Sequence, residues 1–100
     1  MWRQGDILIE AVDAIPPTAG ALNHRIIAEG AATGHRHAVE GPRGVQLYVY
    51  GGNHYLRVEG ARATIVHPEH GPIVLGAGLY RIWRQREYTG TGTVSRNVMD

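Results

Sequence analysis

The chain has 100 residues, which fits one domain spanning 1–100 with a modest core. It has no cysteine, which excludes disulfides and thiolate metal sites, and its formal net charge of +1 argues against a general nucleic-acid-binding surface. No apolar stretch approaches the roughly eighteen residues of a membrane helix, and residues 1–12 lack the apolar core of a secretory signal, so we expect a cytoplasmic protein without a membrane partner.

Short strand signals follow one another along the chain, each bounded by glycine, proline or asparagine. They predict strands over 6–12, 24–29, 35–40, 45–50, 54–59, 61–67, 72–75, 79–88 and 92–98. The prolines within 14–23 make that segment an irregular connection, and no amphipathic helical period lasts three turns. The pattern predicts an all-β fold, a single compact antiparallel β-sandwich or barrel with little or no helix.

Glycine-rich segments predict where the strands reverse. Residues 50–53, YGGN, favour a tight turn that joins the strands at 45–50 and 54–59 into a hairpin. A second reversal is predicted at 76–78 and a third after Tyr88.

Aromatic and arginine residues are concentrated in two strands. In 45–50 the side chains of Tyr48 and Tyr50 share one face, which covers either a second layer of the fold or a partner chain. In 79–88 arginines alternate with aromatic residues, a pattern found both in proteins that bind single-stranded nucleic acids and in protein–protein interfaces. The near-neutral charge favours an interface, or an internal Arg–Glu network, and we expect a homo-oligomer rather than a nucleic-acid partner. The expected interface residues are Tyr48, Tyr50, Trp83, Arg84 and Arg86.

The segment TGHRHAVEG, 33–41, sets His35 and His37 two positions apart in a predicted strand. Residues at this separation point to the same face about 7 Å apart, while Arg36 points away. Two imidazoles so placed can converge on one ion at about 2.0–2.1 Å each.

A second pair occurs in VHPEHGP, 66–72. His67 continues the apolar face of its strand, and the turn begun by Pro68 brings His70 to the same rim. If this rim meets the first pair, four imidazoles could surround one divalent transition metal, with Glu40 or Glu69 as a carboxylate ligand or as an acceptor that hydrogen-bonds to a ligand. Zinc, copper, nickel, iron and manganese suit such a site.

Two other interpretations of the histidines stay open. The pairs could be two unrelated structural pairs that only form hydrogen bonds, or clustered imidazoles that repel one another near pH 6 and loosen an interface. His24, after a loop, and His54, at a hairpin end, have the ordinary surroundings of non-ligand histidines.

The segments GAATGHRHAVEG, 30–41, and HPEHGPIVLGAGLYRI, 67–82, together resemble the cupin pattern, a glycine-led His-x-His with a following Glu and then a second Gly/Pro-rich hairpin. The resemblance implies a jelly-roll-like domain that binds a metal. Its ligands would be His35, His37 and Glu40, with His67 or His70 as the remaining one. The chain also resembles small uncharacterised bacterial or phage proteins that share a Gly-His-x-His element.

The sequence therefore favours a small β-barrel or sandwich that binds a divalent transition metal through its histidines, as a homo-oligomer. The alternative is a non-catalytic structural or self-assembling module, and a further one is a metal-dependent enzyme of unknown substrate with an open coordination position. No catalytic residue can be named, because the chain lacks cysteine and its one serine, Ser95, lies in no nucleophile pattern.

Overall fold

The computed structural model of the protein describes residues 1–29, 34–88 and 95–97. These residues form strands and loops, with no helix that could cross a membrane. The strands are β1 (Trp2–Gln4), β2 (Ile7–Val12), β3 (Gly20–Ala21), β4 (Ile26–Glu29), β5 (Arg36–Glu40), β6 (Val45–Tyr50), β7 (Asn53–Val66), β8 (Ile73–Arg84), β9 (Arg86–Tyr88) and β10 (Ser95–Asn97). The predicted all-β class is confirmed.

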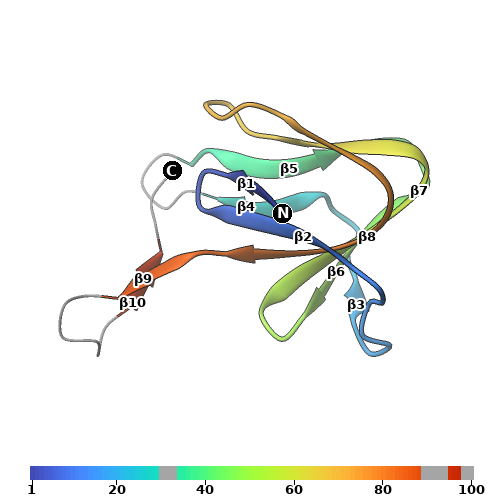
Figure 1. The fold of residues 1–100 in the computed structure, drawn as a ribbon, viewed down its shortest axis with the longest axis horizontal. Helices are drawn as coiled ribbons and strands as arrows, with labels where there is room; N and C mark the ends of the chain where they lie inside the picture. Colours follow the sequence, from blue (N-terminus) through green and yellow to red (C-terminus); the bar gives the residue numbers. More distant parts are fainter. Residues whose placement is uncertain (30–33, 89–94, 98–100) are drawn as a thin grey trace.

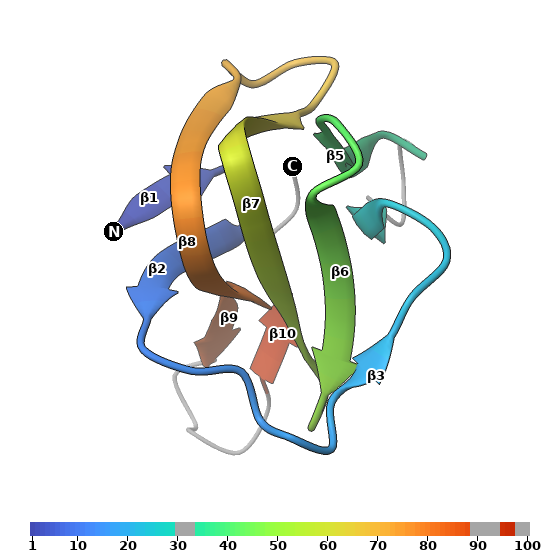
Figure 2. The same ribbon diagram turned by 90° about the vertical axis from the view of Figure 1, so that its right-hand side faces the viewer.

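Eight strands form one antiparallel sheet that curls around its own inner face (Figure 1). The strand order is β1-β2-β8-β7-β5-β4, and β6 pairs with both β7 and β3. Figure 2 shows β8, β7 and β6 side by side, with β5 behind them. Strands β9 and β10 pair separately from this sheet.

The two longest strands, β7 and β8, pair along most of their length and bend together. Their register shifts between Val58 and Arg62, and at this corner Gly60 and Gly78 have φ angles of 90° and 153°. Residues that carry a Cβ atom rarely adopt such φ angles, so the two glycines permit the bend. Because of it, β7 pairs with β6 before the corner and with β5 after it, while β8 pairs with β2 only in its second half.

This corner corrects two predictions. The expected strands at 54–59 and 61–67 are one continuous strand, and the expected reversal at 76–78 is a bend inside β8. The chain reverses instead at 67–72, between β7 and β8. Glycine serves bends and reversals alike, so composition alone did not separate them.

Other elements match more closely. The hairpin of β6 and β7 is confirmed, with positive φ angles of 59° at Gly51 and 80° at Gly52. Strand β1 and the short strand β3, which lies within the expected connection at 14–23, were not predicted. The turn expected after Tyr88 falls on 89–94, outside the described residues.

The inner face of the curled sheet holds the core. Strand alternation places one side of each strand inward, and in β6 that side carries the buried Val45 and Leu47. The buried hydrophobic residues are Ile7, Ile9, Ile27, Val39, Val45, Leu47, Leu56, Val58, Ala63, Ile65, Leu75, Tyr80 and Ile82. Four polar residues are buried with them: Gln4, Asp6, His37 and His67. These four residues belong to the candidate functional site.

Candidate functional site

Four histidines gather at one end of the sheet. His35 immediately precedes β5, His37 lies within it, and the connection that carries His67 and His70, gold in Figure 1, curls above β5. The ring centroids of His37 and His67 are 4.3 Å apart and those of His67 and His70 are 4.6 Å apart. The separation is 5.7 Å for His35 and His67, and 6.3 Å for His37 and His70. We call these four residues the histidine cluster.

Strand register explains the meeting of the two segments. Ala38 of β5 pairs with Val66 of β7, so the next residues along the two antiparallel strands, His37 and His67, come side by side. His67 continues the buried face of Ala63 and Ile65, as predicted. The structure thus brings together all four histidines that the sequence singled out.

His37 is fully buried and is oriented by Gln4 of β1. Gln4 Nε2 donates 2.9 Å hydrogen bonds to the carbonyl oxygens of Ile65 and Gly71, which fixes the orientation of the amide. Gln4 Oε1 therefore faces His37 Nδ1, at 2.9 Å, and Nδ1 must donate the hydrogen bond. One nitrogen of the most buried ring is committed to a protein partner.

Asp6 engages the other nitrogen of the same ring. Its Oδ1 lies 3.3 Å from His37 Nε2, and its Oδ2 lies 2.8 Å from Nε of Arg84. Arg84 Nη2 also donates a 2.8 Å hydrogen bond to the carbonyl of Glu29, which links β8 to β4. An imidazole that faces acceptors at both nitrogens fits its doubly protonated form, which the carboxylate between two cations stabilises.

The outer part of the cluster is more open. His35 Nδ1 lies 2.5 Å from Glu69 Oε1, with side-chain exposures of 33% and 57%. The backbone N–H of Glu69 donates a 3.0 Å hydrogen bond to His67 Nδ1, which makes Nδ1 the unprotonated nitrogen and leaves the proton on Nε2 in the neutral ring. His70 Nε2 is buried without a hydrogen-bond partner among the described residues.

As these side chains lie, no three of the described histidine, aspartate and glutamate residues are arranged to hold a metal ion. The expected carboxylate ligand Glu40 alternates with buried Val39 and lies exposed at the end of β5. Glu69, the other expected candidate, is the carboxylate that contacts the cluster.

The expected interface residues divide between two faces. Tyr48 and Trp83 lie on the outer face of the sheet, and Tyr50 is 45% exposed at the end of β6. Arg84 faces inward, where it pairs with Asp6. The side chain of Arg86 lies outside the described part of the chain.

Sequence reasoning missed Gln4 and Asp6. Both occur near the first turn of the chain, where polar residues are ordinarily exposed, and their partners are at least 31 residues away in the sequence. The weak signal that was available is their proximity to the buried strand that starts at Ile7.

Residues 3–85 match a family model described as a domain of unknown function, DUF8820. The chain belongs to this family. The match includes every residue of the histidine cluster together with Gln4, Asp6 and Arg84, and it is in keeping with the expected likeness to small uncharacterised proteins. Comparison with curated proteins found no match, and comparison with solved structures found none either.

Proposed function

We propose that the domain binds a divalent transition metal ion at the histidine cluster, through His35, His67 and His70. The observation that carries the proposal is the juxtaposition of four imidazoles from two segments, with ring centroids 4.3–6.3 Å apart. Imidazole nitrogen is a preferred ligand of zinc, copper, nickel and iron.

His70 supplies the second support. Its Nε2 is buried and has no hydrogen-bond partner among the described residues. A buried polar atom without a partner costs about 1–3 kcal/mol, and a metal ion would remove that cost.

His37 has a different part in the proposal. Its two nitrogens are engaged by Gln4 and Asp6, so it forms the base of the site rather than a ligand. Because no three side chains converge on one point as they lie, binding requires rotation of the rings at the rim, and His67 must give up the hydrogen bond from the Glu69 N–H to Nδ1 or lose the proton on Nε2. His35 is partly exposed and can turn, and Glu69 beside it offers a carboxylate oxygen.

The resemblance to the cupin pattern supports the same kind of site with a changed ligand set. In the resemblance Glu40 would be the carboxylate ligand, whereas Glu69 is the one beside the rings. We propose Glu69 in that role, which any of the metals suited to imidazole would accept.

The test is a cobalt(II) titration of metal-free, untagged protein, read from the visible absorption of the bound ion. About one ion per chain is expected, and His35→Ala and His70→Ala each weaken binding about tenfold or more. The matched control removes the imidazoles of His24 and His54, outside the cluster, and leaves binding unchanged. Less than about 0.2 zinc per chain after loading, unaltered by His70→Ala, would rule the site out.

A purely structural role is the second candidate, because His37 makes two polar contacts that need no metal. This role predicts that a chelator does not alter the melting temperature, while His37→Gln lowers it. A metal site at the rim predicts that zinc raises the melting temperature, since a ligand that binds only the folded state stabilises it.

We also propose that the domain self-associates through the outer face of the sheet. Tyr48 lies opposite Tyr55, Tyr55 lies opposite Arg81, and the Arg81 guanidinium lies 4.4 Å from the ring centre of Trp83. Aromatic residues and arginine are enriched at protein interfaces. Sedimentation analysis is expected to give a dimer or larger species that Tyr48→Glu dissociates; a monomer at all concentrations would contradict this.

A further inference from the structure

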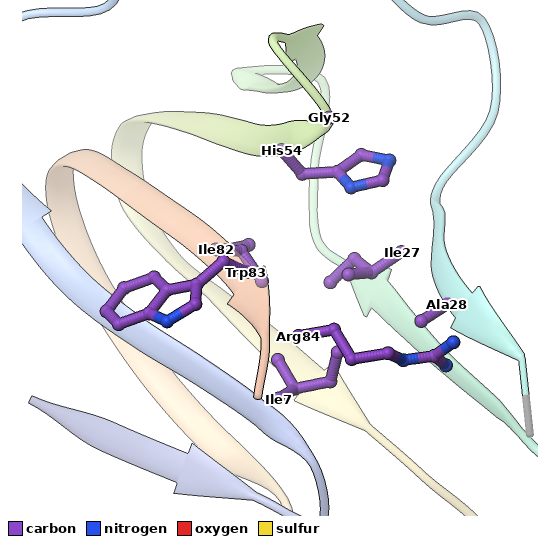
Figure 3. Close-up of a pocket in the computed structure, with 8 residues that line it drawn as sticks. All are labelled: Ile7, Ile27, Ala28, Gly52, His54, Ile82, Trp83 and Arg84. Carbon is purple, nitrogen blue, oxygen red and sulfur yellow. The ribbon is translucent and has the colours of Figure 1, made fainter. Parts of the chain in front are cut away.

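A pocket lies on the inner side of the sheet, away from the proposed metal ligands. Strand register builds it: His54 pairs with Ile82, and Arg84 pairs with Ile7, so these side chains line adjacent rows of the inner face. Strand β4 lies opposite, with Ile27 and Ala28. The residues around it are Ile7, Ile27, Ala28, Gly52, His54, Ile82, Trp83 and Arg84, of which Trp83 directs its indole away from the others (Figure 3).

The pocket combines an apolar floor with polar groups from two strands. Figure 3 shows Ile27 between the imidazole of His54 and the guanidinium of Arg84, with Ile82 to one side and Ile7 next to the stem of Arg84. Its volume is about 230 Å³. Pockets for drug-sized ligands start at roughly 300 Å³, so this one suits a smaller molecule.

The polar groups of the pocket indicate which chemical group a bound molecule must have. None of the described residues that line the pocket is acidic. Asp6 holds Arg84 through Nε and the Glu29 carbonyl takes Nη2, so among the described residues Nη1 has no hydrogen-bond acceptor. Guanidinium groups only donate, and a carboxylate is the acceptor that matches them best.

His54 offers a hydrogen bond without adding a charge. Burial lowers the pKa of His54 below its ordinary 6.5, and the nearby charge of His24 lowers it further. The ring is therefore neutral at pH 7, with one donor and one acceptor nitrogen. An apolar pocket with a few convergent polar groups and a perturbed titratable residue is typical of a small-molecule site.

We propose that this pocket binds a small organic carboxylate, whose apolar body contacts the three isoleucines and whose carboxylate is held by Arg84. The site is separate from the proposed metal ligands and does not depend on metal binding. Ala28 leaves the space open, because a larger side chain at this position of β4 would occupy it.

The test uses benzoate as the probe, titrated into metal-free protein and followed by NMR at His54 and at the Ile82 methyl groups. We expect saturable shifts at both residues. Benzyl alcohol, which lacks the charge, and acetate, which lacks the apolar body, are each expected to bind about tenfold more weakly or worse. Ala28→Leu is expected to abolish the shifts, whereas Ala61→Leu, an equal enlargement at an exposed position, leaves them unchanged.

Three results would overturn the proposal: no saturation at millimolar benzoate, equal binding of benzyl alcohol, or undiminished binding by Ala28→Leu. If Ala28→Leu fails to fold, Ala28→Val is the substitute, and it must weaken benzoate binding while its spectrum stays that of the folded protein. Failure here would leave the metal proposal untouched, because the cobalt titration reads different residues.

Discussion

Two histidines point to the inner face of the same sheet and are accommodated in different ways. His37 is fully buried between the carboxylate of Asp6 and the amide of Gln4. His54 lines a pocket, and its pKa is lowered by burial and then by the charge of His24. The surroundings of a buried imidazole decide which of its forms is favoured: a carboxylate that faces the ring favours the charged form, whereas burial without a facing carboxylate favours the neutral form.

The largest effect is expected from removal of the Asp6 carboxylate, which distinguishes the surroundings of His37 from those of His54. Asp6→Ala leaves His37 and Arg84 without the charge between them, in a site where the Asp6 side chain is 3% exposed. Loss of one partner from a buried ion pair costs about 3–5 kcal/mol, so we expect a drop of that size in the free energy of unfolding. Denaturant unfolding measures it.

Glu10 provides the control for Asp6. It pairs with Arg81 at 3.1 Å, but both side chains are about one-third exposed, at 36% and 35%. Glu10→Gln is expected to cost about 0–1 kcal/mol, because water solvates the remaining charge. Equal losses in the free energy of unfolding for Asp6→Ala and Glu10→Gln would show that the buried ion pairs of Asp6 stabilise the fold no more than an exposed pair does.

A smaller effect is expected from the amide that orients His37. Gln4→Leu leaves His37 Nδ1 and the carbonyls of Ile65 and Gly71 without partners, at a cost of about 1–3 kcal/mol. Gln46 also donates to two carbonyls, at 2.8 Å, but is only half-buried. Gln46→Leu is therefore expected to cost less, and the reverse order in denaturant unfolding would contradict the assigned role of Gln4.

Local pattern could predict part of this arrangement. Strand alternation correctly made His67 continue the face of Ala63 and Ile65, and the rings of His35 and His37 both lie near that of His67. Those inferences need only the period of a strand, which neighbouring residues define.

The rest depends on pairing between distant segments. The register of Ala38 with Val66, which unites the cluster, is a contact between strands separated by β6 in the sequence. Gln4 and Asp6 are buried and Arg84 is half-buried because each finds its partner in a distant segment, so their local pattern resembles that of surface residues. The bend at Gly60 and Gly78 was not predicted because glycine permits both a bend within a strand and a turn between strands.

The subtlest test concerns the pKa of His54. Because that pKa is lower in the folded protein than the ordinary 6.5, the unfolded chain binds the proton more tightly, and this residue makes stability fall as pH decreases below about 6.5. His54→Gln should therefore reduce the loss of stability between about pH 7 and pH 5. NMR titration should give His54 a pKa below 6.5, which His24→Asn raises only in part, since burial is the larger cause. A pKa at or above 6.5 in the wild-type protein would remove the contrast with His37 and, with it, the neutral hydrogen-bonding ring proposed for the pocket.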